Sequence, residues 1–66
     1  MNLRLRELRE GRGLTQAAVG DQLLCDQSLY SKYERGERSL PLELAAKLAD
    51  YYGVTLDYLV GRTDEP

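Results

Sequence analysis

Four polar residues that lie close together in the chain have side chains suited to binding a ligand through hydrogen bonds. Gln27, Ser28, Ser31 and Lys32 are spaced so that one outward face of a helix carries them. Carboxamide and hydroxyl groups both donate and accept hydrogen bonds, whereas an ammonium group only donates. This face is polar and rich in hydrogen-bonding groups, so it favours non-covalent recognition.

Covalent or acid-base catalysis has little support in the sequence. The chain has no histidine, and its lone Cys25 falls in a turn that we expect to be packed. Gly11-Arg12-Gly13 is not a phosphate loop, because it lacks the later glycine and the preceding strand of that motif. The paired carboxylates Asp64-Glu65 lie in a loose tail. A small helical domain also offers little concave pocket. We therefore predict no enzyme activity, no cofactor, no metal site and no small-molecule ligand.

Length and composition restrict the chain to one small domain. Its 66 residues are 42% hydrophobic and 30% charged, which is a globular balance. A single cysteine cannot form an internal disulfide. No apolar run approaches the roughly 20 residues that span a bilayer, and the N-terminus lacks the apolar stretch of a signal peptide. We expect a cytoplasmic protein. Its net charge of −2 would, taken alone, argue against binding nucleic acid.

The elements that must position the polar face are helices, because apolar residues recur with helical spacing throughout. Capping and stop residues predict five of them. The first carries Leu5 and Leu8, and the others span 16–23, 27–35, 41–52 and 56–60. The core should hold the apolar stripe of the fourth helix, which consists of Leu42, Ala45, Ala46, Ala49 and Tyr52. It should also hold three further tyrosines, Tyr30, Tyr33 and Tyr58. This predicts an all-α, compact five-helix bundle spanning 1–61, followed by a polar tail at 62–66.

The second and third helices are predicted to form a helix-turn-helix. Only Leu24-Cys25 separates them, which is too short for an antiparallel hairpin, so the two helices should cross steeply. A steep, close crossing needs a small residue, and Gly20 lies in the middle of the second helix. A glycine at such a position costs about 1 kcal/mol relative to alanine, so it requires a packing reason. Val19, Cys25, Tyr30 and Tyr33 supply the apolar contacts between the two helices.

These residues resemble a known family. The motif is Leu14-Thr15-Gln16, then Gly20, then Ser31-Lys32-Tyr33-Glu34-Arg35-Gly36, with supporting similarity at 42–45 and 48–59. In this joint spacing the chain is similar to the phage-repressor helix-turn-helix family (Cro/cI, or XRE, type), over residues 3 to 61. The resemblance implies a lambda-repressor-like DNA-binding domain. It also implies two-fold dimers on operator DNA, with the third helix in the major groove.

The resemblance further implies a role for particular residues. Gln27 and Ser28 would contact base edges, and Leu29 would meet a thymine methyl group on the same outward face as Ser31. Gln16, at the start of the second helix, would bind a phosphate. The implied base-contacting set is Gln27, Ser28, Leu29, Ser31 and Lys32, and the implied phosphate-contacting set is Gln16, Arg35 and Arg38.

Some of these residues also fit a purely structural role. Gln16 favours the phosphate role over a plain helix surface, whereas Lys32 fits an ordinary solvated lysine about as well as a DNA contact. Arg9 with Glu34 resembles the family's buried ion pair. The arginines of the first helix alternate with Glu7 and Glu10, which favours a solvated face over a membrane surface.

The chain departs from the family pattern at three positions. Leu24 replaces the usual turn glycine, Asp26 replaces the usual serine or threonine cap, and Glu37 stands where a basic residue is common. If the turn is left-handed at Leu24, the leucine should cost about 1–2 kcal/mol. Asp26 would cap the third helix but would also bring negative charge near phosphates.

The sequence therefore predicts a sequence-specific, double-stranded DNA-binding transcriptional regulator, expected to be a repressor and a homodimer on a palindromic operator. An antitoxin-like protein-interaction module is the alternative, because an exposed patch of Leu40, Leu44 and Tyr51 would suit either a second copy or a foreign partner. The charge is unevenly distributed. Residues 1–38 carry 7 basic and 6 acidic side chains, net +1, whereas residues 39–66 carry 2 and 5, net −3. This predicts a binder with a small phosphate footprint.

Overall fold

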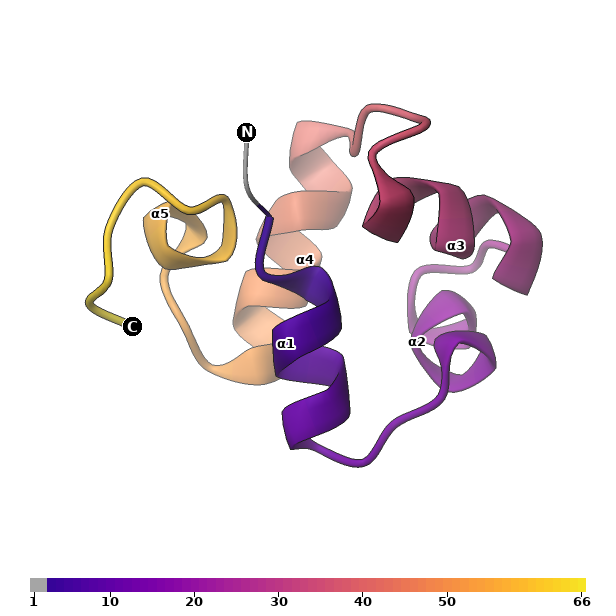
Figure 1. Cartoon of the computed structure of the whole chain (residues 1–66), viewed down its shortest axis with the longest axis horizontal. Coiled ribbons are helices and arrows are strands. Elements are labelled where there is room, and N and C mark those ends of the chain that lie inside the picture. Colours follow the sequence, from indigo (N-terminus) through magenta and orange to yellow (C-terminus); the bar gives the residue numbers. More distant parts are fainter. Residues whose placement is uncertain (1–2) are drawn as a thin grey trace.

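The computed structural model describes residues 3–66, so the first two residues of the predicted domain lie outside the described residues. Its helices are α1 (Leu5–Gly11), α2 (Gln16–Gln22), α3 (Gln27–Arg35), α4 (Leu42–Tyr52) and α5 (Leu56–Leu59). Within 3–66 there is no strand, and the predicted all-α, five-helix fold is confirmed. In Figure 1, α2 and α3 lie on one side of α1 and α4, and α5 lies on the other side.

The helices begin and end close to the residues that the sequence indicated. Thr15, Asp26 and Thr55 each accept a hydrogen bond from the backbone amide three residues later, as N-caps do. Gly36 and Gly53 end α3 and α4 in the left-handed conformation. Three boundaries differ from the prediction by one residue. The second helix ends at Gln22 instead of residue 23, and the fifth ends at Leu59 instead of residue 60. Pro41 is the N-cap of α4 instead of its first helical residue.

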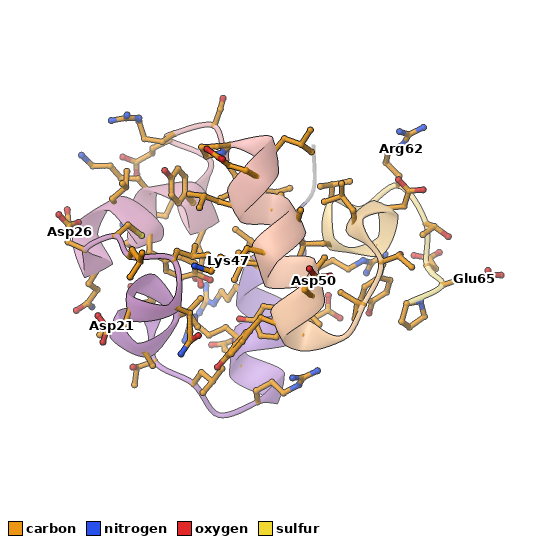
Figure 2. All side chains as sticks on the ribbon, turned by 180° about the vertical axis from the view of Figure 1, so that it is seen from behind. Asp21, Asp26, Lys47, Asp50, Arg62 and Glu65 are labelled. Carbon is orange, nitrogen blue, oxygen red and sulfur yellow. The ribbon has the colours of Figure 1, made fainter. Side chains whose placement is uncertain are left out.

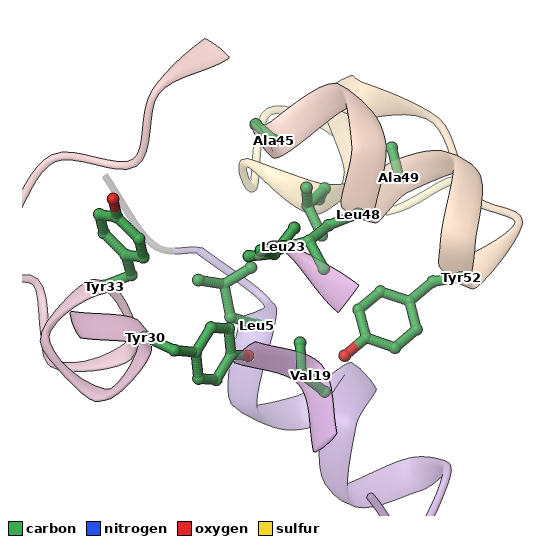
Figure 3. Packing of buried hydrophobic residues seen from close by; sticks show 10 residues of the cluster. Leu5, Val19, Leu23, Tyr30, Tyr33, Ala45, Leu48, Ala49 and Tyr52 are labelled. Carbon is green, nitrogen blue, oxygen red and sulfur yellow. The ribbon is translucent and has the colours of Figure 1, made fainter. Parts of the chain in front are cut away.

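One apolar cluster holds the helices together, with contributions from all five (Figure 3). In Figure 3, the Tyr30 and Tyr52 rings enter the core from opposite sides, with Val19 between them. The buried members are Leu5, Val19, Leu23, Tyr30, Tyr33, Ala45, Leu48, Ala49, Tyr52 and Leu59.

Three predicted core positions are wrong. Leu42 is 72% exposed and Ala46 is also exposed, because the face of α4 that meets the core passes through Ala45, Leu48 and Ala49. Tyr58 is only half-buried, and its ring lies beneath the guanidinium group of Arg4, whose Cζ is 4.3 Å from the ring centroid. The amphipathic stripe of α4 is therefore narrower than its apolar residues suggested.

The crossing of α2 and α3 depends on the glycine in α2. A Cβ added to the buried Gly20 would lie 3.1 Å from the carbonyl oxygen of Cys25 and 3.5 Å from that of Asp26. The Cys25 amide donates to the Gly20 carbonyl at 3.0 Å, so the turn closes directly onto the helix. Leu24, in this turn, has a φ of 57° and is 88% exposed, which confirms the left-handed turn considered from the sequence.

Arg4 joins the two ends of the described chain. Its backbone amide donates to the Leu59 carbonyl at 2.9 Å, and its guanidinium donates to the Tyr58 carbonyl at 2.9 Å and to an Asp64 carboxylate oxygen at 2.7 Å. It also donates to the Thr63 carbonyl. Part of the polar tail is therefore held against the start of α1, away from the α2–α3 unit.

Candidate nucleic-acid interface

The outward face of α3 carries the polar residues singled out in the sequence. Gln27 and Ser28 are exposed in the first turn, directly after Asp26, whose carboxylate accepts from the Leu29 amide at 2.7 Å. Ser31 and Lys32 follow one turn later and are half-buried. The cap fixes the first turn of α3, so the Gln27 and Ser28 side chains project from an ordered backbone.

A shallow, open hollow of about 540 Å³ lies between the start of α2 and the outward face of α3. Both helices contribute to its wall, because their steep crossing brings the first residue of α2 close to α3. The hollow is lined by Gln16, Asp26, Gln27, Ser28, Ser31 and Arg35. Five of the eight predicted contact residues therefore surround one depression, whereas Leu29, Lys32 and Arg38 do not line it.

A buried ion pair supports one wall of this hollow. The Arg9 Nε lies 2.6 Å from the Glu34 Oε2, and the side chains are only 12% and 4% exposed. Arg9 also donates to the Leu14 carbonyl at 2.9 Å, so the pair joins α1, the loop after it and α3. The structural role inferred for these two residues agrees with this geometry.

The pair also sets the protonation state of Glu34. Burial favours the neutral acid, but hydrogen bonds to the carboxylate, above all from Arg9, outweigh burial and lower the pKa of Glu34 below its ordinary value. The pKa of Arg9 is raised by its hydrogen bond to Glu34. Both groups are therefore charged at neutral pH.

Gln16 is attached to the same pair. Its Nε2 donates to the Glu34 Oε1 at 3.2 Å, and the residue is half-buried. A carboxamide nitrogen carries two hydrogens, so one of them remains for a further acceptor. The contact fixes Gln16 in the wall of the hollow.

Arg35, the last residue of α3, and Arg38, in the loop after it, line different hollows. Arg35 lines the hollow, where its Nε donates to the Glu37 carboxylate and one of its terminal nitrogens donates to the Ser31 hydroxyl. This ion pair lowers the pKa of Glu37, mainly through the hydrogen bond from Arg35. Arg38 is exposed in the following loop and lines a second hollow instead.

Leu29 differs most from its predicted placement on the outward face. It is half-buried and packs against the core cluster, so only part of its side chain remains for contact with a ligand. Leu29 directly precedes the fully buried Tyr30, and its side chain lies at the border between the buried and the outward face of α3.

Arg6 is a candidate contact that sequence reasoning missed. It is exposed in α1 and lines a further hollow together with Gln16, Ser31 and Arg35. Its Nε lies 3.4 Å from the Glu10 carboxylate. No local pattern in α1 indicates which of its arginines faces α3, because that choice depends on how the helices pack.

The second hollow, of about 430 Å³, lies beside the C-terminal end of α3 and is mostly apolar. The strongly exposed Leu42 contributes to it, and Leu40 is half-buried there. Its lining residues are Leu3, Gly36, Arg38, Ser39, Leu40, Leu42, Ala45 and Val60. The sequence predicted an exposed patch of Leu40, Leu44 and Tyr51, and of these three residues only Leu40 lines this hollow.

Residues 3–66 contain neither a membrane-spanning helix nor a cluster of metal-ligating side chains. None of the helices is long and apolar enough to cross a membrane. Within the same part of the chain, no three histidine, cysteine, aspartate or glutamate side chains gather in a way that could hold a metal ion.

Comparison with known proteins links this geometry to a family. The helix-turn-helix family profile HTH_3 matches residues 5–59. The chain is 36% identical over 63 residues to YobD of Bacillus subtilis, an uncharacterised helix-turn-helix transcriptional regulator, covering 96% of this chain and 56% of YobD. It is also 36% identical over 61 residues to the phage transcriptional repressor RstR of Vibrio cholerae, covering 92% of this chain and 55% of RstR.

A solved structure of a transcriptional regulator has the same fold as this chain. A transcriptional regulator from Listeria innocua superposes with a TM-score of 0.86 at 27% identity, covering 96% of this chain and 59% of that protein. The chain spans about half the length of the curated relatives it matches. Those relatives are named as transcriptional regulators and not as enzymes, and they include both repressors and an activator.

Proposed function

Because the chain belongs to the HTH_3 helix-turn-helix family of the XRE (Cro/cI) type, we propose that it is a sequence-specific, double-stranded DNA-binding transcriptional regulator. In this proposal α3 enters the major groove. The hollow between α2 and α3 is the observation that carries the proposal, because it gathers polar side chains from both helices on one open surface.

The proposed contacts divide into two kinds. Gln27 and Ser28 contact base edges, since they are exposed at the leading end of α3. A glutamine carboxamide matches the N6 and N7 atoms of adenine, and such a bidentate pair is worth roughly 1–3 kcal/mol of discrimination. Ser31, Lys32 and the exposed part of Leu29 form the next layer of the base-contacting face.

Phosphate contacts are proposed for Gln16, Arg35 and Arg38. Gln16 retains one amide hydrogen beyond its bond to Glu34, and it lies at the opposite wall of the hollow from Gln27. Arg35 lies on the same wall as Ser31. Contacts of this kind fix the register of the protein on the duplex without reading its sequence.

We propose that the regulator acts as a repressor on a palindromic operator, as a cytoplasmic homodimer. A second copy seated on the apolar hollow around Leu40, Leu42 and Val60 would turn the C-terminal ends of the two α3 helices toward each other, because this hollow lies at the C-terminal end of α3. Two half-sites in successive major grooves require recognition helices about 34 Å apart. The name of RstR, a phage repressor, supports the repressor assignment.

The base-reading role is tested by selecting bound sequences from a random duplex pool. Gln27→Ala should relax the base preference at one position of each half-site and leave the melting temperature unchanged, since Gln27 is exposed. Gln22→Ala, an exposed glutamine at the end of α2, is the matched control and should select the same sequences as the wild type. An unchanged profile for Gln27→Ala would contradict its role in reading bases.

A salt titration separates DNA binding from protein binding. Duplex affinity should fall steeply as salt rises, because each neutralised phosphate releases counterions. Salt-insensitive association with another protein, and none with any duplex, would contradict the DNA-binding proposal and favour the interaction module.

A further inference from the structure

The cation best placed for a phosphate contact already has an anionic partner within the protein. Arg35 is the last residue of α3, and its Nε donates to the carboxylate of Glu37, two residues later. Both side chains are about half exposed, at 52% and 54%. The same guanidinium donates to the Ser31 hydroxyl one turn earlier, so it lies along the outward face of α3.

This ion pair lies beside the proposed DNA-contacting surface. Arg35 and Ser31 line both the hollow that includes Gln27 and the hollow that includes Arg6 and Arg9. An approaching phosphate would therefore meet a guanidinium that is already neutralised. Glu37 holds an exposed negative charge against this guanidinium, at the edge of the same surface.

Carboxylate and phosphate oxygens bind a guanidinium in the same way. Both offer oxygen atoms with the spacing of its paired N–H groups, so the two anions compete for one donor surface. Exposed ion pairs are weak, so a phosphate can displace Glu37, but the displaced carboxylate stays within reach and repels the backbone. Each phosphate contact through Arg35 therefore includes the breaking of the Glu37 contact.

We infer that Glu37 is an intramolecular competitor of the DNA backbone that holds Arg35 and thereby limits the affinity of this protein for duplex DNA. This inference rests on the proposed function, because it concerns the same surface. The competition is independent of base sequence, since it acts on a phosphate contact.

The test uses Glu37→Gln, which removes the charge and keeps the shape of the side chain. The probe is a fluorescently labelled 24-base-pair duplex of mixed sequence, titrated from about 50 mM to 200 mM salt, where the screening length is on the order of 10 Å. The variant should bind roughly two- to fivefold more tightly than the wild type at the lowest salt. Its log-affinity against log-salt slope should be steeper by up to about 0.9, the value of one full phosphate contact, because Arg35 no longer divides its charge between Glu37 and the phosphate.

Two controls separate this competition from a change of net charge. Asp50→Asn removes the same charge from an exposed residue of α4 (labelled in Figure 2) that lines neither of the hollows lined by Arg35, and this variant should bind like the wild type. In a protein that already carries Arg35→Gln, the Glu37→Gln substitution should not increase the affinity for the duplex. Thermal melting of each variant checks that it remains folded.

The outcomes are distinct. Three results would overturn the role of Glu37 while leaving DNA binding intact. The wild type and Glu37→Gln could bind the duplex equally tightly, or Asp50→Asn could raise the affinity as much as Glu37→Gln does. The third such result is a rise in affinity from Glu37→Gln that persists when Arg35 is replaced. If neither the wild type nor any folded variant binds the duplex at the lowest salt, the proposed DNA-binding function itself is wrong, and the role of Glu37 is overturned with it.

Discussion

At the scale of single residues, Leu24 is the position where the sequence and the local backbone disagree most. Its φ of 57° places a branched-chain residue in the left-handed region, which costs about 1–2 kcal/mol because the Cβ approaches the following carbonyl. The side chain is 88% exposed and gains little from packing. The α2–α3 turn is therefore held in shape by its neighbours, above all by the hydrogen bond from Cys25 to Gly20.

Leu24→Gly should raise the free energy of unfolding by about 0.5–1 kcal/mol. Glycine removes the backbone strain, although its greater freedom in the unfolded chain offsets part of the gain. Denaturant unfolding measures the change. Leu24→Ala is the control, because alanine keeps the Cβ and should not stabilise the protein. Equal stabilisation by both substitutions would show that the exposed side chain, and not the backbone angle, is responsible.

The buried Glu34 should make the stability depend on pH. Its pKa is lower in the folded protein than its ordinary value of 4.5, so its contribution is present above that value and is lost as the pH falls through the folded pKa. Glu34→Gln should reduce the free energy of unfolding at neutral pH by about 2–4 kcal/mol, because Arg9 then loses its buried partner.

Unfolding followed by circular dichroism across the acid range measures this effect. The gap between the wild type and Glu34→Gln should narrow as the pH drops below 4.5. Glu7→Gln, an exposed glutamate in α1, serves as the control and should follow the wild-type curve. A gap that stays constant with pH would contradict a charged Glu34.

At the scale of elements, the α2–α3 crossing determines whether the interface exists. The hollow forms only if α2 and α3 approach closely enough for Gln16 and Gln27 to face one depression. The absence of a side chain at Gly20 permits that approach, since the Cys25 carbonyl oxygen would lie 3.1 Å from an added Cβ. A mid-helix glycine, unfavourable for an isolated helix, is thus required by the packing of two helices.

Gly20 and Gly11 form a matched pair that tests this point. A Cβ at Gly11, the last residue of α1, would meet nothing within 4 Å, so Gly11→Ala should stabilise the protein by about 0.5–1 kcal/mol through helix propensity. Gly20→Ala should give no such gain, because the added methyl group pushes against a backbone carbonyl. Thermal melts of the two variants measure the difference. Similar stabilisation at both positions would mean that the crossing tolerates a side chain.

At the scale of the whole molecule, the two ends of the fold carry different charge and different surfaces. Residues 1–38, which include α2 and α3, carry a net charge of +1, and residues 39–66 carry −3. Arg4 holds the tail against α1 through Asp64, so these tail residues lie with α1 and α5 and not with the α2–α3 unit. The acidity of the chain as a whole therefore does not exclude a DNA-binding surface at one end.

The apolar hollow around Leu42 is the surface at which two copies are proposed to meet. Leu42→Glu places a charge on the apolar hollow and should convert a dimer on a palindromic duplex to a monomer, as measured by analytical ultracentrifugation. Because Leu42 is 72% exposed, the fold should be unaffected. Tyr51→Glu, also exposed on α4 but outside the hollow, is the control. A wild-type protein that binds a saturating operator as a monomer would refute the two-fold arrangement.

The sequence by itself determined the helices, their ends and the helix-turn-helix. Caps such as Thr15 and Asp26, glycine stops and the apolar period act over one or two turns, so they can be interpreted without knowing the rest of the fold. The need for a small residue at Gly20 was predictable for the same reason. Five of the eight predicted contact residues gather around one hollow.

Only the tertiary structure decided which side chains meet across the helices. The bond from Gln16 to Glu34, the placement of Arg6 beside Ser31, the half-burial of Leu29 and the exposure of Leu42 all depend on how each helix is rotated about its axis. That rotation results from the packing of a core built by residues far apart in the chain, from Leu5 to Leu59. Local sequence signals do not specify it, because each helix reveals its apolar side but not the neighbour that covers it.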